Sequence, residues 1–106
     1  MKMAERMRNE ARVRRLVELV CKELGTDPNL VLSRHRRDGI PDVRHLCMFL
    51  AIEELGLSFN QLEKVFDRDH TTIMHAWEKV SLAVKQWPEM RDLVVFLRRR
   101  VREELG

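Results

Sequence analysis

The sequence has 106 residues, 44% hydrophobic and 35% charged, with four glycines and three prolines, a composition that argues against disorder and a loop-rich β fold. No apolar run reaches the ~18 residues that span a bilayer, and the chain start lacks the apolar part of a signal peptide, so we expect a cytoplasmic protein without membrane contact. Residues 1–44 hold 11 Lys or Arg against 7 Asp or Glu, whereas residues 45–106 hold 9 against 10, an asymmetry that favours a polyanionic partner.

The first half of the chain predicts two long helices with a basic loop between them. An apolar stripe of helical period predicts a helix from about Glu10 to Leu24, and Asp27-Pro28 predicts the start of a short helical turn. The segment Ser33–Gly39, here called the basic loop, contains the densest basic cluster, although a solvated surface loop is the alternative reading. A second helix from Pro41 to Leu55 is apolar nearly all round and is expected at the centre of the fold.

The second half predicts three more helices. Ser58-Phe59-Asn60-Gln61 matches a capping box and predicts a short helix through Phe66, followed by a tight turn at Asp67-Arg68. Asp69 then caps a helix over residues 70–87, and a last helix covers about 89–105. The run Arg98-Arg99-Arg100 on this last helix is expected to be a solvated face, with an extra phosphate contact as the alternative. Cys21 and Cys47 are expected to be buried thiols rather than a disulfide. The expected fold is all-α, a bundle of five or six helices.

Two short helices joined by a tight turn are typical of a helix-turn-helix, in which the second helix enters the major groove of DNA. Asp can accept a hydrogen bond from a cytosine amino group, Thr offers a hydroxyl and a methyl group, and His can donate or accept. An ordinary surface helix with a good N-cap is the alternative. The candidate base-contacting residues at the start of helix 70–87 are Arg68, Asp69, His70, Thr71 and Thr72.

The run from Phe66 to Ala76 resembles the signature R-D-H-T-T-V-x-H-A of the C-terminal DNA-binding domain, domain IV, of the DnaA replication initiator family. The resemblance covers about residues 11–106 and leaves residues 1–10 as an N-terminal extension or the start of a linker helix. It implies a helix-turn-helix fold similar to that of Trp repressor. By position it implies that Asp69, His70 and Thr71 read bases in the major groove, while Arg68 and Thr72 help to hold the duplex.

The resemblance also implies contacts outside the major groove. An arginine of the family's basic loop enters the minor groove at the A/T-rich end of the DnaA box. Arg36 is the best match for it, with Arg34 and Arg37 as alternatives within the cluster 34–37. The positions that match contacts to the DNA backbone are Arg44, Ser58 and His75.

The sequence departs from the family pattern at the turn between the two helices. The family turn usually reads Phe-Gly-Gly-Arg, whereas this chain has Phe66-Asp67-Arg68, which is one residue shorter and lacks glycine. Asp67 also adds a negative charge close to the expected phosphates. His45 replaces a common glutamine, and Ile52 stands where some members have a basic residue.

Several chemical functions find no support in the sequence. The family's ATPase domain carries G-x-x-x-x-G-K-[ST], which is absent here, so we expect no ATP site in this chain and an ATPase domain only in a possible parent protein. Asp69 and His70 are adjacent, but no nucleophile accompanies them, so no enzymatic activity is expected. His and Cys residues lack zinc-ligand spacing, and we expect no metal and no cofactor.

The leading hypothesis is therefore sequence-specific binding of double-stranded DNA at a DnaA-box-like site. Helix 70–87 would lie in the major groove and the cluster 34–37 in the minor groove, in replication initiation or its regulation, in association with the bacterial nucleoid. The alternatives are a stand-alone transcriptional regulator, a protein-interaction module derived from the same domain, and a membrane-surface role of the basic amphipathic ends.

Overall fold

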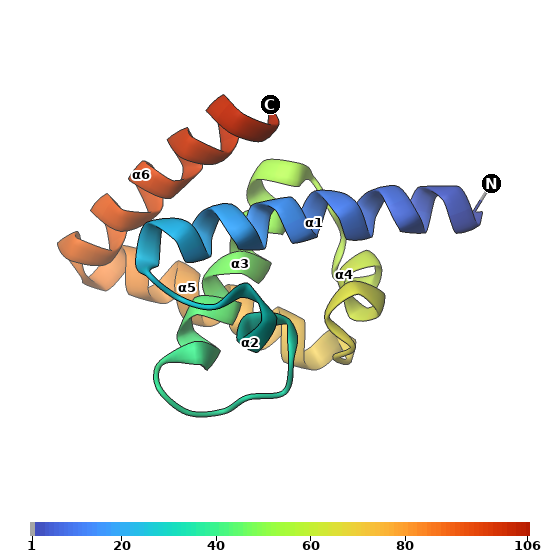
Figure 1. Ribbon diagram of the computed structural model, residues 1–106. Coiled ribbons are helices and arrows are strands. Elements are labelled where there is room, and N and C mark those ends of the chain that lie inside the picture. The colour runs from blue at the N-terminus through green and yellow to red at the C-terminus, as the bar shows by residue number, and fades with distance from the viewer. Residues whose placement is uncertain (1) are drawn as a thin grey trace.

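The computed structural model describes residues 2–106 and consists of six α-helices, with no strand among these residues (Figure 1). The prediction of an all-α fold is confirmed. In chain order the helices are α1 (Lys2–Leu24), α2 (Pro28–Leu32), α3 (Ile40–Leu55), α4 (Phe59–Phe66), α5 (His70–Gln86) and α6 (Pro88–Leu105).

The first helix begins earlier than expected. Apolar periodicity predicted a start near Glu10, but α1 runs without a break from Lys2, and Figure 1 shows one straight rod. Residues 2–8 are all exposed, and their apolar residues Met3 and Met7 do not continue into the buried stripe that begins at Val13. Alanine, glutamate, arginine and methionine are strong helix formers, and an ion pair joins Arg6 to Glu10 one turn later at 3.7 Å. The expected extension 1–10 is thus, from residue 2, part of α1.

The other boundaries differ from expectation by single residues. Helix α5 ends at Gln86 instead of Trp87, because a residue that precedes proline avoids helical dihedral angles. Pro88 opens α6 at a position that needs no backbone N–H.

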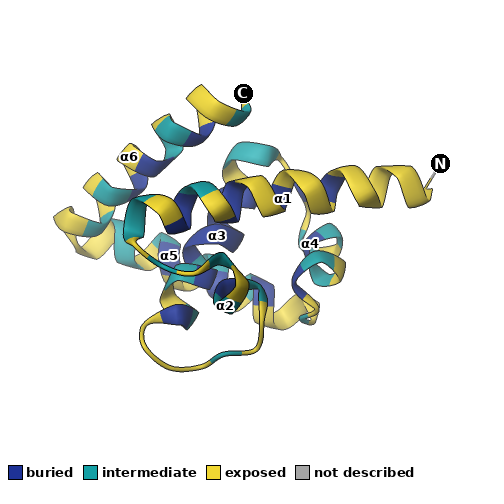
Figure 2. Ribbon diagram, viewed as in Figure 1, coloured by how far each residue is buried: buried dark blue, intermediate teal, exposed yellow. Residues whose placement is uncertain are grey.

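Helix α3 lies at the centre of the bundle, as its sequence predicted. All six residues from Leu46 to Ala51 are buried, and α3 packs against α1, α2, α5 and α6. Figure 2 shows the buried positions of α1 and α5 on the sides that face α3. Burying a Leu, Met or Phe side chain contributes about 1.5–3 kcal/mol, so this helix supplies much of the driving force for folding.

Both cysteines are buried free thiols, as predicted. Burial raises the pKa of Cys21 to about 11, with a smaller effect of Asp27, and burial also raises the pKa of Cys47. These thiols are therefore packing residues without a reactive thiolate. Across residues 2–106, no three His, Cys, Asp or Glu side chains gather as a metal site would require, and none of the helices is long and apolar enough to cross a membrane.

Helix α6 is joined to the core by ion pairs, which corrects the expectation that Arg98-Arg99-Arg100 is a solvated face. Arg98 lies 3.3 Å from the carboxylate of Glu54 on α3, and Arg100 lies 3.1 Å from Glu23 on α1. Arg102 pairs with the same Glu54 oxygen at 2.7 Å. Only Arg99 of the triplet is exposed.

We expect Glu54→Gln to destabilise the fold. The Glu54 side chain is only 7% exposed and faces two guanidinium groups, so the neutral amide leaves the partly buried charge of Arg98 and the exposed charge of Arg102 without their partner. The loss should be about 1–3 kcal/mol, between the values for exposed and buried ion pairs. Urea unfolding measures it, with Glu18→Gln on the exposed side of α1 as the control. Equal stability of the two variants would show that the pairs with Glu54 contribute nothing.

We expect the partly buried side chain of His45 to make the fold less stable in mild acid. Its Nδ1 atom is buried and has no hydrogen-bond partner among residues 2–106. Burial lowers the pKa of His45, and the charges of Lys79 and Arg44 lower it further, whereas Asp42 opposes them. The unfolded chain therefore binds a proton below a pH of about 6.5 before the folded chain does.

This contribution to stability is present above the unfolded pKa and is lost as the pH falls through the folded pKa. Between about pH 7.5 and about pH 5, wild type should therefore lose more stability than His45→Gln. The urea midpoint at each pH measures the difference. Parallel curves for the two proteins over this range would exclude His45 as the source.

Candidate nucleic-acid interface

The helix-turn-helix consists of α4, the turn at residues 67–69, and α5. The capping box predicted at its start is present: the Ser58 hydroxyl accepts the Gln61 backbone N–H at 3.1 Å, and the Gln61 side chain accepts the Ser58 N–H at 2.9 Å. Ser58 is thus the N-cap of α4, and its contact with the DNA backbone stays a prediction. Leu62 and Phe66 are buried and hold α4 against the core.

The turn is built on a left-handed residue that is not glycine. Asp67 has φ 51° and ψ 50°, and its N–H and that of Arg68 both donate to the Glu63 carbonyl. Aspartate tolerates this conformation better than most residues with a side chain. The turn therefore closes without the glycines that are usual in the family it resembles.

Asp69 is the N-cap of α5. One carboxylate oxygen accepts the Thr72 backbone N–H at 2.8 Å. Hydrogen bonding to Thr72 lowers the pKa of Asp69, with help from the Thr71 N–H and His70, so the group stays ionised near neutral pH. The capping role is therefore present, and the second oxygen can still accept a base amino group.

His70, Thr71 and Thr72 are all exposed on the first turn of α5. The Nδ1 atom of His70 lies 3.1 Å from the Asn60 side-chain oxygen, and the edge of the ring meets Phe59 at a centroid distance of 5.3 Å. Asn60 accepts, so Nδ1 carries the proton in the neutral ring and Nε2 is left as an acceptor. Helix α4 thereby orients the imidazole, a contribution that sequence reasoning did not find.

The two faces of α5 divide as predicted. Ile73, Ala76 and Val80 are buried, whereas His75 and Glu78 are exposed. Trp77 is a packing residue: its ring stacks on Phe49 at 6.5 Å, and its indole N–H donates to Glu53. The outer face of α5 is therefore polar and open.

The basic loop projects from the bundle between α2 and α3 (Figure 1). Arg36 and Arg37 are exposed and make no ion pair within residues 2–106. His35 is more covered, with its ring 3.4 Å from Asp38 and its backbone N–H donated to the Ser33 hydroxyl. The two free guanidinium groups are thus the cations that the loop offers to a partner.

Arg44 occupies a different position from the one expected of a phosphate contact. It is 5% exposed, and its guanidinium donates to four backbone carbonyls, those of Leu30, Val31, Ser33 and His35. Burial and the nearby Arg68 lower the pKa of Arg44, although an arginine stays charged at any physiological pH. Arg44 therefore holds the start of the basic loop on α3, and its contact with phosphate stays untested.

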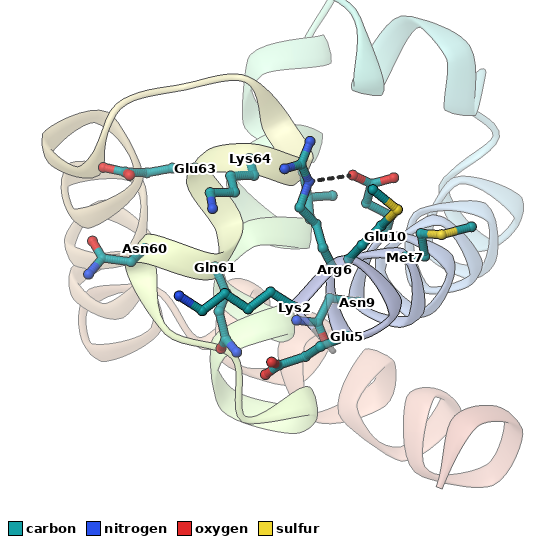
Figure 3. Close-up of a pocket in the computed structure, with 12 residues that line it drawn as sticks. Lys2, Glu5, Arg6, Met7, Asn9, Glu10, Asn60, Gln61, Glu63 and Lys64 are labelled. Carbon is teal, nitrogen blue, oxygen red and sulfur yellow. Dashed lines mark ion pairs between the residues drawn. The ribbon is translucent and has the colours of Figure 1, made fainter.

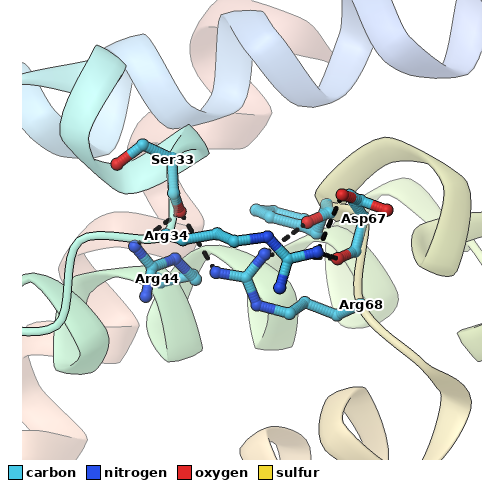
Figure 4. A network of polar contacts seen from close by, with 6 residues as sticks. Ser33, Arg34, Arg44, Asp67 and Arg68 are labelled. Carbon is cyan, nitrogen blue, oxygen red and sulfur yellow. Dashed lines mark hydrogen bonds and ion pairs between the residues drawn. The ribbon is translucent and has the colours of Figure 1, made fainter.

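The basic loop and the turn of the helix-turn-helix touch each other. Arg34 donates to the Asp67 carboxylate at 2.8 Å and to its carbonyl at 3.1 Å, while Arg68 donates to the Ser33 carbonyl at 3.1 Å (Figure 4). Figure 4 also shows Arg44 reaching the same Ser33 carbonyl. The two sequence-predicted DNA-contacting segments thus form one continuous surface, although Arg34 and Asp67 are 33 residues apart in the chain.

A separate groove of about 640 Å³ lies between the start of α1 and α4 (Figure 3). Its charged lining residues are of both signs, and they include Lys2, Glu5, Arg6, Glu10, Glu63 and Lys64. This mixed lining contrasts with the basic surface around loop 33–39.

A short helix, a tight turn and a second helix with an open polar first turn define the class of helix-turn-helix DNA-binding domains. The family model described as the bacterial dnaA protein helix-turn-helix matches residues 13–80. The chain therefore belongs to the DnaA C-terminal helix-turn-helix family.

The relatives agree with this assignment. The chromosomal replication initiator protein DnaA of Caldanaerobacter subterraneus subsp. tengcongensis is 33% identical over 93 residues, which are 88% of this chain and 21% of that protein. The chain thus spans about a fifth of the length of that relative.

Two solved structures share the fold over 98% of this chain and 32% of theirs. A DNA replication initiation factor superposes with a TM-score of 0.85 at 24% identity. A replication initiator DnaA bound to AMPPCP and single-stranded DNA superposes with a TM-score of 0.83 at 21% identity.

Proposed function

We propose that this domain binds double-stranded DNA sequence-specifically at a DnaA-box-like site. The first turn of α5 enters the major groove, where Asp69, His70 and Thr71 contact base edges. The observation that carries the proposal is the single surface on which this exposed polar turn and the basic loop lie side by side, joined through Arg34 and Arg68.

The major-groove part follows from the chemistry of the first turn. The Asp69 carboxylate and the Nε2 atom of His70 both accept hydrogen bonds, which suits the amino groups of cytosine and adenine. Thr71 adds a hydroxyl and a methyl group that can meet thymine. Arg68 and Thr72 flank these residues and hold the duplex, and the positive end of the helix favours phosphate nearby.

The minor-groove part rests on the basic loop. Arg36 is exposed and free of ion pairs within the described chain, so it can enter a narrow A/T-rich groove, where the negative potential is strongest. Arg37 has the same freedom, whereas Arg34 is engaged by Asp67. His75 on α5 and Ser58 at the cap of α4 are exposed, and we propose that both contact the DNA backbone.

In the cell the domain would act in replication initiation or its regulation. The relative that shares 33% identity is named a chromosomal replication initiator protein, and the present chain corresponds to a fifth of its length. An ATPase domain would then belong to a parent protein, and the setting would be the bacterial nucleoid. The domain itself contributes binding and no catalysis.

Fluorescence anisotropy tests the proposal with two labelled duplexes, one with a consensus DnaA box and one with the box scrambled. We expect tighter binding to the box, and a steep fall of affinity between low and moderate salt because phosphate contacts release counterions. Equal affinity for both duplexes would overturn the sequence-specific reading. Absence of salt-sensitive binding would overturn DNA binding altogether and favour a protein-interaction module.

A further inference from the structure

The basic loop and the turn each donate hydrogen bonds to the other. Arg34 of the loop donates twice to Asp67 of the turn, and Arg68 of the turn donates to Ser33 of the loop. The Ser33 carbonyl also accepts from Arg44, which is anchored on α3 (Figure 4). Movement of residues 33–34 away from the turn would break the three bonds between the loop and the turn together.

Asp67 adopts a backbone conformation that glycine would adopt with less strain. Its φ is 51°, in the left-handed region that side chains disfavour. Aspartate at this position gains an ion pair with Arg34 at 2.8 Å, an interaction that glycine cannot make. The Asp67 side chain therefore makes an ion pair that the turn does not need in order to form.

The pair also alters the charges on the surface. Asp67 is a negative charge on the face that meets phosphate, and the Arg34 guanidinium neutralises it. Because Arg34 is bound to Asp67, the minor groove is left to Arg36 and Arg37, which lie two and three residues further along the chain. Since the start of the loop is held by Arg34 and Arg44, the reach of Arg36 is set relative to α5.

From this arrangement we infer that Arg34 and Asp67 are a positioning pair, which holds the basic loop at a fixed position relative to α5. A DNA site then binds tightly only when its major groove suits α5 and its minor groove suits the basic loop. This inference rests on the proposed function. Arg34 acts through Asp67 and does not read the minor groove itself.

The free protein offers a first test. Asp67→Asn keeps a residue that tolerates the left-handed conformation but removes the charge. Trypsin cleaves after arginine, and exposed loops are cut when they open. We expect cleavage after Arg36 or Arg37, followed by mass spectrometry, to be about two- to five-fold faster in this variant, the range for loss of an exposed ion pair. Asp92→Asn, the same charge change on exposed α6, should match wild type.

Binding to DNA gives the second test. Two duplexes share the segment that faces α5 but differ at the other end, which is A/T-rich in one and G·C-rich in the other. We expect the ratio of their affinities to fall about two- to five-fold in Asp67→Asn and to stay unchanged in Asp92→Asn. If removal of a negative charge simply tightened both duplexes alike, with unchanged cleavage by trypsin, the inference would be overturned.

A double-mutant cycle separates positioning from direct reading. If Arg34 acts through Asp67, Arg34→Gln lowers the affinity ratio in wild type but adds much less in Asp67→Asn, where only the bond to the residue 67 carbonyl remains. An equal, additive loss in both backgrounds would mean that Arg34 enters the groove, and the inference would be wrong. If wild type itself shows no preference between the duplexes, the proposed function fails; a preference that Asp67→Asn retains defeats this inference alone.

Discussion

Replacing His70 or Thr71 by alanine should make DNA binding less selective, at a cost of about 1–3 kcal/mol each on the preferred duplex. Both side chains are exposed on the first turn of α5, and neither caps the helix, a role that belongs to Asp69. The variants should therefore keep the fold. Loss of the oriented Nε2 acceptor of His70 removes a base contact, so the preferred and scrambled duplexes should approach the same affinity.

Anisotropy titrations with both duplexes measure this effect, and His75→Ala is the matched control. His75 lies one turn further along the exposed face of α5, where a contact with the backbone would weaken every duplex equally. The ratio of affinities should thus survive in His75→Ala and fall in His70→Ala and Thr71→Ala. Undiminished discrimination in His70→Ala would show that α5 is not the recognition helix.

Arg44→Ala should lower both stability and affinity. The guanidinium is buried and donates to the carbonyls of residues 30, 31, 33 and 35, so its removal leaves these acceptors without their partner. We expect a loss of about 2–3 kcal/mol in the free energy of unfolding, because water can reach only part of the vacated site. The loosened loop should also weaken binding to all duplexes, with a smaller salt slope.

Arg37→Ala separates the loss of stability from the loss of DNA affinity. Arg37 is exposed and makes no ion pair within the described residues, so its loss should leave urea unfolding unchanged while still reducing the salt slope. Wild-type stability in Arg44→Ala would contradict the structural role that its four hydrogen bonds indicate.

Much of the fold and of the candidate site could be read from local patterns. The capping box at Ser58, the cap at Asp69, the apolar run of α3 and the exposed first turn of α5 all depend on residues within one or two helical turns. Such signals persist in any fold that contains the helix. For this reason the helix-turn-helix and its candidate base-contacting residues followed from sequence alone.

Apolar periodicity did not predict structure correctly for segments whose residues are not part of the buried core. The start of α1 is helical but exposed, so no buried stripe marked it, and it was assigned to an extension or the start of a linker helix. The triplet Arg98-Arg99-Arg100 has the composition of a solvated face, yet two of its members meet carboxylates on α1 and α3. Nothing within α6 distinguishes these arginines from the exposed Arg99.

The roles of the other arginines were decided by tertiary structure. Arg34, Arg36, Arg37 and Arg44 are one chemical type in one basic region, but only packing brings Arg34 to Asp67 and buries Arg44 among carbonyls. Helix caps and apolar periodicity do not reveal these partners, because hydrogen bonds and ion pairs between distant segments depend on how whole helices dock. Local sequence patterns thus specify the helices and the chemistry of the first turn of α5. The docking of α2, α3 and α4 selects which charges remain free for DNA.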